Sequence, residues 1–228
     1  MDNVLSYARR PANPAVAANR DLETPLTVEQ RSAMIDAVAV KMTEVLDILR
    51  IDHREDPNTR DTPRRVAKMY VEELLAGRFS APPKITEFAT TQNFDELIVT
   101  GPIEVRTTCA HHLMPIYGTA IVGIMPSADG RLIGLSKYDR VVQHFARRFQ
   151  VQEELVNQIG EYLVDVTKPR GLAVRIKAVH MCKTHRGVNA THASQMVSSA
   201  YFGELKTNDR LKSEFLQECL GLERSGQP

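Results

Sequence analysis

The first third of the chain has apolar residues spaced as in amphipathic helices. Between residues 28 and 50 they recur at steps of three and four, so one face of a helix would be apolar. A polar turn follows over residues 53–59. A second helix is expected over residues 62–77, with Thr62 as N-cap and Pro63 in the first turn, where its missing N–H costs nothing.

After Pro82 and Pro83 the apolar period changes to two, which is typical of β-strands. Residues 103–109 alternate apolar and polar side chains, and Cys109 falls in phase with the apolar face. Since His112 cannot share that face at a spacing of three, the strand is expected to turn at Cys109. A returning strand is expected over residues 116–125, followed by a turn at Asp129-Gly130.

The last hundred residues predict two further strands and three helices. Residues 136–139 resemble a capping box that begins one helix, and a second helix is expected over 152–166. Every second residue from Leu172 to Cys182 lies on one face of a strand and most of these residues are apolar, so a single strand would point His180 and Cys182 inward. A strand over 196–202 and a helix over 208–220 complete an antiparallel α+β pattern without βαβ alternation.

Composition narrows the class of protein. The chain has 228 residues, 43% of them hydrophobic, which suffices for one core with a terminal extension. A net charge of +1 argues against binding of nucleic acid or a membrane surface through bulk charge. We see no apolar run that could span a bilayer and no secretory signal.

The N-terminal residues 1–23 are rich in Ala, Asn and Pro and show no period. Arg9, Arg10 and Arg20, with no acidic residue over positions 5–20, weakly resemble a transit peptide. A flexible tail is the favoured interpretation.

Metal-binding residue types are concentrated in two short segments. Cys109-Ala110-His111-His112 closes one predicted strand, and His180-Met181-Cys182 closes another. A lone His or Cys is usually a core residue, but thiolates and imidazoles grouped in this way indicate zinc. Cys109, His112 and Cys182 would be three ligands and leave a fourth place for water, as in a catalytic site.

Two histidines of these segments, His111 and His180, remain outside that ligand set. Each could orient a ligand or transfer protons, since imidazole titrates near neutrality. No role is predicted for His53, His144, His192 or Cys219. The three cysteines form no disulfide framework and suit a reducing compartment such as the cytoplasm.

A three-ligand zinc lowers the pKa of bound water to about 7, which favours a hydrolytic reaction. Alcohol dehydrogenases use a similar Cys₂His set, but the chain has no G-x-G-x-x-G for a nicotinamide cofactor. Nucleobase deaminases need a P-C-x-x-C segment that is also missing. Neither class fits.

Basic residues accompany predicted helix starts and the metal segments. Lys137 and Arg140 begin one helix, Arg65 follows the start of another, and Arg186 comes shortly after Cys182. Each alone is an ordinary surface charge. Their grouping near these segments indicates a binding site for a polyphosphate.

Five separated motifs carry a resemblance to GTP cyclohydrolase I, in the same order and over about residues 22–222. They are residues 61–70 (DTPRRVAKMY), 109–115 (CAHHLMP), 133–137 (IGLSK), 150–153 (QVQE) and 178–182 (AVHMC) with Arg186-Gly187. The resemblance implies that GTP and water give 7,8-dihydroneopterin triphosphate and formate, the first step toward folates and other pterins. It also implies a cytoplasmic homo-oligomer, a decamer of two pentamers, with active sites between subunits.

The same resemblance implies a T-fold (tunnelling fold), an antiparallel sheet with helices on one face, preceded by N-terminal helices. The expected organisation is a flexible tail over residues 1–23, a helical region over 24–80 and a catalytic T-fold domain over 81–228.

The resemblance also assigns roles to individual residues. Cys109, His112 and Cys182 would bind Zn²⁺, and His111, His180 and Ser136 would be catalytic. Glu153, supported by Gln152, would bind guanine. The triphosphate would be held by Lys137, Arg140, Arg186 and Arg65.

The chain departs from the family pattern at three places. Ala110 stands where the family commonly has Glu, residues 183–185 (KTH) replace a segment that is often apolar, and Phe149 stands where Pro is frequent. None of these changes removes a ligand. They leave open a second hypothesis, a non-catalytic paralogue that binds nucleotide or regulates an active partner.

Overall fold

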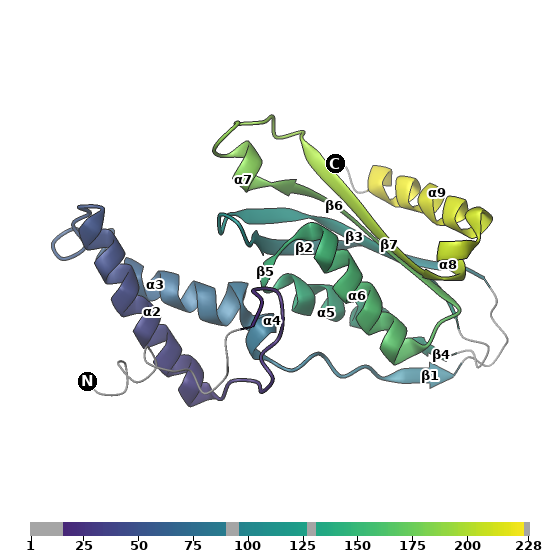
Figure 1. Cartoon of the computed structure of the whole chain (residues 1–228), viewed down its shortest axis with the longest axis horizontal. Helices are drawn as coiled ribbons and strands as arrows, with labels where there is room; N and C mark the ends of the chain where they lie inside the picture. The colour runs from purple at the N-terminus through teal and green to yellow at the C-terminus, as the bar shows by residue number, and fades with distance from the viewer. Residues whose placement is uncertain (1–15, 90–95, 127–130, 226–228) are drawn as a thin grey trace. The chain divides into compact units, whose positions relative to one another are not determined.

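The computed structural model describes residues 16–89, 96–126 and 131–225. The chain forms two compact units, Met1–Ala81 and Pro82–Pro228, and Figure 1 shows the elements of each. None of the helices in these described ranges combines the length and the apolar character that crossing a bilayer needs.

The first unit begins with helix α2, Val28–Ile48. Its N-terminus is closed by a capping box, in which the Thr27 side chain accepts from the Gln30 N–H while the Gln30 side chain accepts from the Thr27 N–H. The predicted second helix is instead three pieces, α3 (Thr62–Lys68), the π-helix η1 (Met69–Leu74) and α4 (Ala76–Phe79).

The predicted N-cap of this second segment is wrong by one residue. Asp61 is the cap and Thr62 is already helical, and the Asp61 side chain makes no capping hydrogen bond to the helix N-terminus. The π-helix ends where the Leu75 N–H donates to the Tyr70 carbonyl, a five-residue step. Apolar spacing did not predict this π-turn. One extra residue in a turn still leaves apolar residues a few positions apart, as in an ordinary α-helix.

Residues 1–15 of the predicted tail lie outside the described residues. Residues 16–23 are tied to α4, because the Arg78 guanidinium donates to the carbonyls of Val16, Ala17, Ala18 and Arg20 at 2.6–3.2 Å. The small core of this unit consists of Leu26, Ile35, Ala67, Val71 and Phe79.

The second unit is built on a five-stranded sheet in the order β5-β2-β3-β6-β7. The long strands are β2 (Ile98–Cys109), β3 (Pro115–Met125), β6 (Gly171–His180) and β7 (Gln195–Gly203). Neighbouring long strands are antiparallel, as predicted, whereas the short β5 (Phe149–Gln150) runs parallel to β2. A separate pair joins β1 (Glu87–Ala89) to β4 (Arg131–Ile133).

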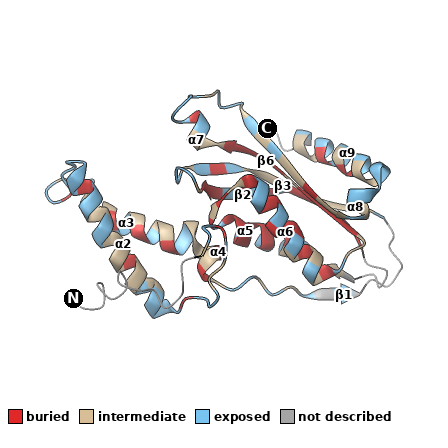
Figure 2. Cartoon of the chain, viewed as in Figure 1, coloured by how far each residue is buried: buried red, intermediate tan, exposed pale blue. Residues whose placement is uncertain are grey.

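Helices cover both faces of this sheet, so the expectation of helices on one face is wrong. Helices α5 (Leu135–Ala146) and α6 (Gln152–Thr167) pack on the main core face. The opposite face is covered by α8 (Glu204–Thr207) and α9 (Asp209–Ser225). Buried residues concentrate in the strands and on the sheet-facing sides of α5 and α6 (Figure 2).

The second layer of helices exists because the sheet is apolar on both faces over part of its length. Ile121, Met125 and Ala173 point away from the main core and are buried by Phe215 of α9 and Leu205 of α8. Burial of the larger of these side chains, such as Ile121 and Phe215, stabilises the fold by about 1.5–3 kcal/mol each.

Two local predictions about helices and strands are corrected by the structure. Helix α5 is capped by Gly134 rather than by a Ser136 capping box, and no side chain bonds its N-terminus. Strand β6 ends at His180, and Met181–Thr184 form the short helix α7, so Cys182 is not a strand residue. The predicted turn at Asp129-Gly130 lies outside the described residues.

We expect Gly118→Ala to lower the free energy of unfolding by about 1–3 kcal/mol, the usual cost of overpacking. A Cβ at Gly118 would overlap the backbone of Lys177 and Ala178 in the paired strand β6, which cannot move aside alone. Urea unfolding followed by circular dichroism measures the change.

Gly221→Ala is the matched control. Gly221 is exposed in α9 with no atom within 4 Å of an added Cβ, so this variant should be about 0.5–1 kcal/mol more stable. Equal stability of the two variants would contradict the close approach of β3 to β6.

Candidate active site

The turn that follows β2 positions the first metal-binding segment. Cys109 is the last residue of the strand and is buried, and its N–H donates to the Met114 carbonyl at 2.8 Å. The Leu113 N–H donates back to the Cys109 carbonyl at 2.9 Å. Leu113 has a φ of +53°, which costs a non-glycine residue about 1–2 kcal/mol. The predicted turn at Cys109 is therefore confirmed.

The second segment reaches the first through the pairing of β3 with β6. His180, the last residue of β6, lies opposite Ile116 of β3, so α7 begins beside the turn after Cys109. One ring nitrogen of His112 and the sulfur atoms of Cys109 and Cys182 all lie within 4.8 Å of one another. The structure therefore brings the three predicted ligands together.

These three atoms fit a tetrahedral metal. Zinc bonds of about 2.0–2.3 Å place neighbouring ligand atoms about 3.3–3.8 Å apart, so a small movement of the side chains closes the site. Burial and the adjacent Cys109 sulfur raise the pKa of the Cys182 thiol. Two neighbouring thiolates repel each other, and a divalent cation between them removes that penalty.

Arg186 lies directly beside the metal cluster. Its Nη1 donates to His112 Nε2 at 3.1 Å, so that ring nitrogen is an acceptor. Metal binding through Nδ1 would leave this contact intact, whereas binding through Nε2 would require Arg186 to move. His111 is also close, with Nδ1 at 3.7 Å from the Cys109 sulfur.

His180 is held by a buried amide. The Gln152 side chain is almost fully buried, and its Oε1 lies 2.7 Å from His180 Nε2. Burial lowers the pKa of His180, and the nearby carboxylate of Glu153 partly opposes this shift. Glu153 itself is exposed in the first turn of α6. Gln152 therefore supports the site from behind rather than from its surface.

Ser136, Lys137 and Arg140 do not join this cluster within one chain. They lie at the start of α5, whose other end leads into β5, the strand paired with Cys109. A helix of 12 residues spans roughly 18 Å. Figure 1 shows β4, which precedes α5, and α7 at opposite ends of the unit.

Near the start of α5, Lys137 Nζ donates to the Lys84 carbonyl at 3.1 Å. Arg65 lies in α3 of the first unit, where it is exposed and bonded to Asp61 at 3.3 Å.

Sequence reasoning missed Ser198. Its hydroxyl accepts from Gln152 Nε2 at 2.9 Å, behind His180. The available signal was parity, because Ser198 shares the inward face of β7 with Ala200 and Phe202 and is the polar residue among them.

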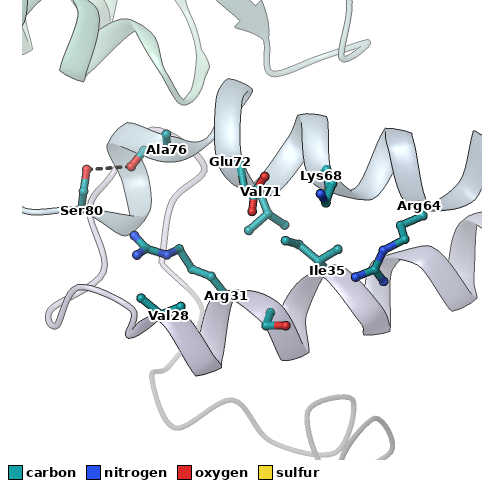
Figure 3. A pocket seen from close by; sticks show the side chains of 10 residues that line it. Val28, Arg31, Ile35, Arg64, Lys68, Val71, Glu72, Ala76 and Ser80 are labelled. Carbon is teal, nitrogen blue, oxygen red and sulfur yellow. Dashed lines mark hydrogen bonds between the residues drawn. The ribbon is translucent and has the colours of Figure 1, made fainter.

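A cavity in the first unit is lined only by residues of that unit. It has a volume of about 500 Å³ and contains none of the Cys and His donors (Figure 3). Its charges are of both signs, and Arg64 is paired with Asp36 at 2.7 Å. The residues that line it include Val28, Arg31, Ile35, Arg64, Lys68 and Glu72.

Comparison with known proteins identifies the family. The family model described as GTP cyclohydrolase I matches residues 38–220, well over half of the chain. The chain belongs to the GTP cyclohydrolase I family. As a member of that family it is an enzyme, and the substrate of the family is GTP.

Curated relatives can be aligned with this chain over nearly its whole length. GTP cyclohydrolase 1 of Shewanella denitrificans is 40% identical over 211 residues, which cover 90% of this chain and 94% of the relative. The Shewanella oneidensis protein of the same name is 38% identical with the same coverage. A solved structure, the archaeosine synthase QueF-Like in the apo form, is similar at 14% identity and a TM-score of 0.35 over 47% of this chain.

For this GTP cyclohydrolase I family member we expect Cys182→Ser to lower zinc affinity by more than about 100-fold. Mutation of a residue that only hydrogen-bonds to a metal ligand already lowers metal affinity by about 10–100-fold, and Cys182 would be a ligand itself. Zinc content after dialysis against a metal buffer measures the change. Cys219→Ala is the control, because Cys219 belongs to α9 and is buried in a separate cluster with Ile121 and Ala173 of the sheet. Full zinc occupancy in the Cys182 variant would remove this residue from the ligand set.

Proposed function

We propose that the protein is a zinc-dependent GTP cyclohydrolase I that converts GTP and water into 7,8-dihydroneopterin triphosphate and formate, the first step toward folates and other pterins. The observation that carries this proposal is the convergence of Cys109, His112 and Cys182 beside His180. Family membership supplies the reaction to which that geometry is matched.

Zinc held by the two sulfurs and the imidazole would supply a water that is nucleophilic at neutral pH, suited to attack on C8 of guanine. His180 would give a proton to the ring nitrogen as the C8–N bond opens. His111, beside the Cys109 sulfur, would move protons as formate leaves. His111, together with Ser136 of a second copy, would then assist opening of the ribose and the Amadori rearrangement.

Glu153 would give the site its preference for guanine. Its carboxylate has two acceptor oxygens for the N1–H and the exocyclic amine of guanine, whereas adenine presents an unpaired acceptor at N1. Its exposed position in the first turn of α6, next to Gln152 and His180, supports this role. Buried polar groups left unpaired reject the wrong base strongly.

The triphosphate would be bound by Lys137, Arg140, Arg186 and Arg65. Arg186 is already beside His112, but Lys137 and Arg140 lie at the far end of α5 in the same chain. We therefore propose that a second copy supplies them, in the T-fold decamer of two pentamers expected for this family. Within the described residues, β7 lies at one edge of the sheet, and on its β5 side β2 is paired only at Thr108 and Cys109. Both edges are suited to strand pairing between copies.

We place this reaction in the cytoplasm. All three cysteines are free thiols, which a reducing compartment preserves.

The protein loaded with zinc should release formate from GTP and form a product that oxidises to a fluorescent pterin. Formate is measured with a coupled dehydrogenase, and ATP is the control substrate that should give none. Glu153→Gln should lower kcat/KM for GTP by roughly 100-fold or more, because one acceptor is replaced by a donor. Absence of formate from the intact metal-loaded oligomer would refute the proposed activity and favour a non-catalytic paralogue.

Mixing two inactive variants tests whether the site is shared between copies. Cys182→Ser and Lys137→Ala should each be inactive alone, since one lacks a metal ligand and the other a phosphate contact. Co-refolded mixtures should recover activity at interfaces where one copy supplies an intact Cys182 and its neighbour supplies an intact Lys137. A mixture as inactive as its parents would mean that each site draws both residues from one chain.

A further inference from the structure

The amide of Gln152 has a fixed orientation in the structure. Its Nε2 lies 3.1 Å from the Ile176 carbonyl, 3.2 Å from the Met196 carbonyl and 2.9 Å from Ser198 Oγ. Carbonyl oxygens only accept hydrogen bonds, so the end of the side chain that faces them must be the NH₂ group. Reversal of the amide would place its oxygen against two other carbonyl oxygens in a buried site, which is unfavourable.

This orientation determines where His180 carries its proton. With the NH₂ group directed at the sheet, the carbonyl Oε1 of Gln152 is the atom that lies 2.7 Å from His180 Nε2. Since Oε1 can only accept, Nε2 must be an N–H donor. The neutral ring therefore has its lone pair on Nδ1, and the cation keeps the same Nε2–H bond.

Ser198 is the replaceable member of this arrangement. The other two acceptors are main-chain carbonyls of β6 and β7, which substitution of a side chain does not remove. The Ser198 hydroxyl gives the shortest of the three contacts to Gln152 Nε2. The NH₂ group has two N–H bonds for these three acceptors, so without the hydroxyl it keeps only the two longer contacts to the carbonyls and is held less firmly in this orientation.

We propose that Ser198, acting through Gln152, is a positioning residue that holds His180 with its proton on Nε2, so that Nδ1 is the nitrogen that exchanges protons with the substrate. In the ring-opening step the Nδ1–H of the imidazolium transfers its proton to the purine nitrogen, and the ring returns to the neutral Nε2–H form. The identity of the substrate rests on the proposed function, whereas the tautomer rests on the contacts of Gln152 alone.

The tautomer is measured on the full-length oligomer by solid-state ¹⁵N NMR with ring-labelled histidine. The chain has seven histidines, so the signals of His180 are assigned by their loss in His180→Asn. At a pH where the ring is neutral, we expect a protonated Nε2 and an unprotonated Nδ1. In Ser198→Ala a population with the opposite pattern should appear, and Ser198→Thr, which keeps the hydroxyl, should restore the original one.

Ser199→Ala is the matched control, because the next residue along β7 points to the opposite face of the sheet. With GTP, Ser198→Ala should lower kcat roughly 10-fold with little change in KM, as expected when a group that orients a catalytic side chain is lost. Ser199→Ala should leave both constants and the spectrum unchanged.

The inference is overturned if wild-type His180 carries its neutral-state proton on Nδ1, or if Ser198→Ala leaves its spectrum unchanged. If the tautomer is as stated but GTP yields no formate, the proposed function fails and the positioning role of Ser198 stands. If formate is released while the tautomer is reversed, only the role of Ser198 fails.

Discussion

The antiparallel register between β3 and β6 is the constraint on which the site depends. The turn at residues 109–114 fixes where β3 begins, and the pairing of Ile116 with His180 fixes where β6 ends. A shift of one residue would turn every side chain of β6 to the other face of the sheet and would move His180 away from Gln152. Two cysteines about seventy residues apart in sequence meet because this register is specified along the whole strand, from Gly171 to His180.

The sequence predicted the parts of the fold that follow from periodicity. The alternation along β2 and β6 gave the strands, their inward faces and the turn at Cys109, because one face of each strand is buried in the main core. The break at Met181 could not be predicted, since a helical turn after a strand preserves neither parity nor apolar spacing. The helix over 208–220 was predicted, but its position on a second face of the sheet was missed, because a strand that is apolar on both faces shows no alternation that would indicate a second covered face.

The candidate site, like the fold, was predictable only in part. The metal-binding set was predictable because Cys and His are rare enough for their grouping in two segments to be informative. The support behind His180 was not, since Gln152, Ser198 and two main-chain carbonyls come from three elements, and two of the contacts involve no side chain of the partner. Similarly, the distance between Lys137 and the metal cluster follows from the direction of α5, which composition and spacing do not define.

The separation of Cys109 and Cys182 along the chain has a consequence for folding. A cation that bridges them closes a loop of about seventy residues, and the unfolded chain offers no comparable site. Such a ligand stabilises the native state by RT ln(1 + [L]/Kd), about 2.7 kcal/mol when free metal exceeds the dissociation constant a hundredfold. The supply of metal in the cell would then govern how long the folded protein survives proteolysis, in addition to whether it can turn over substrate.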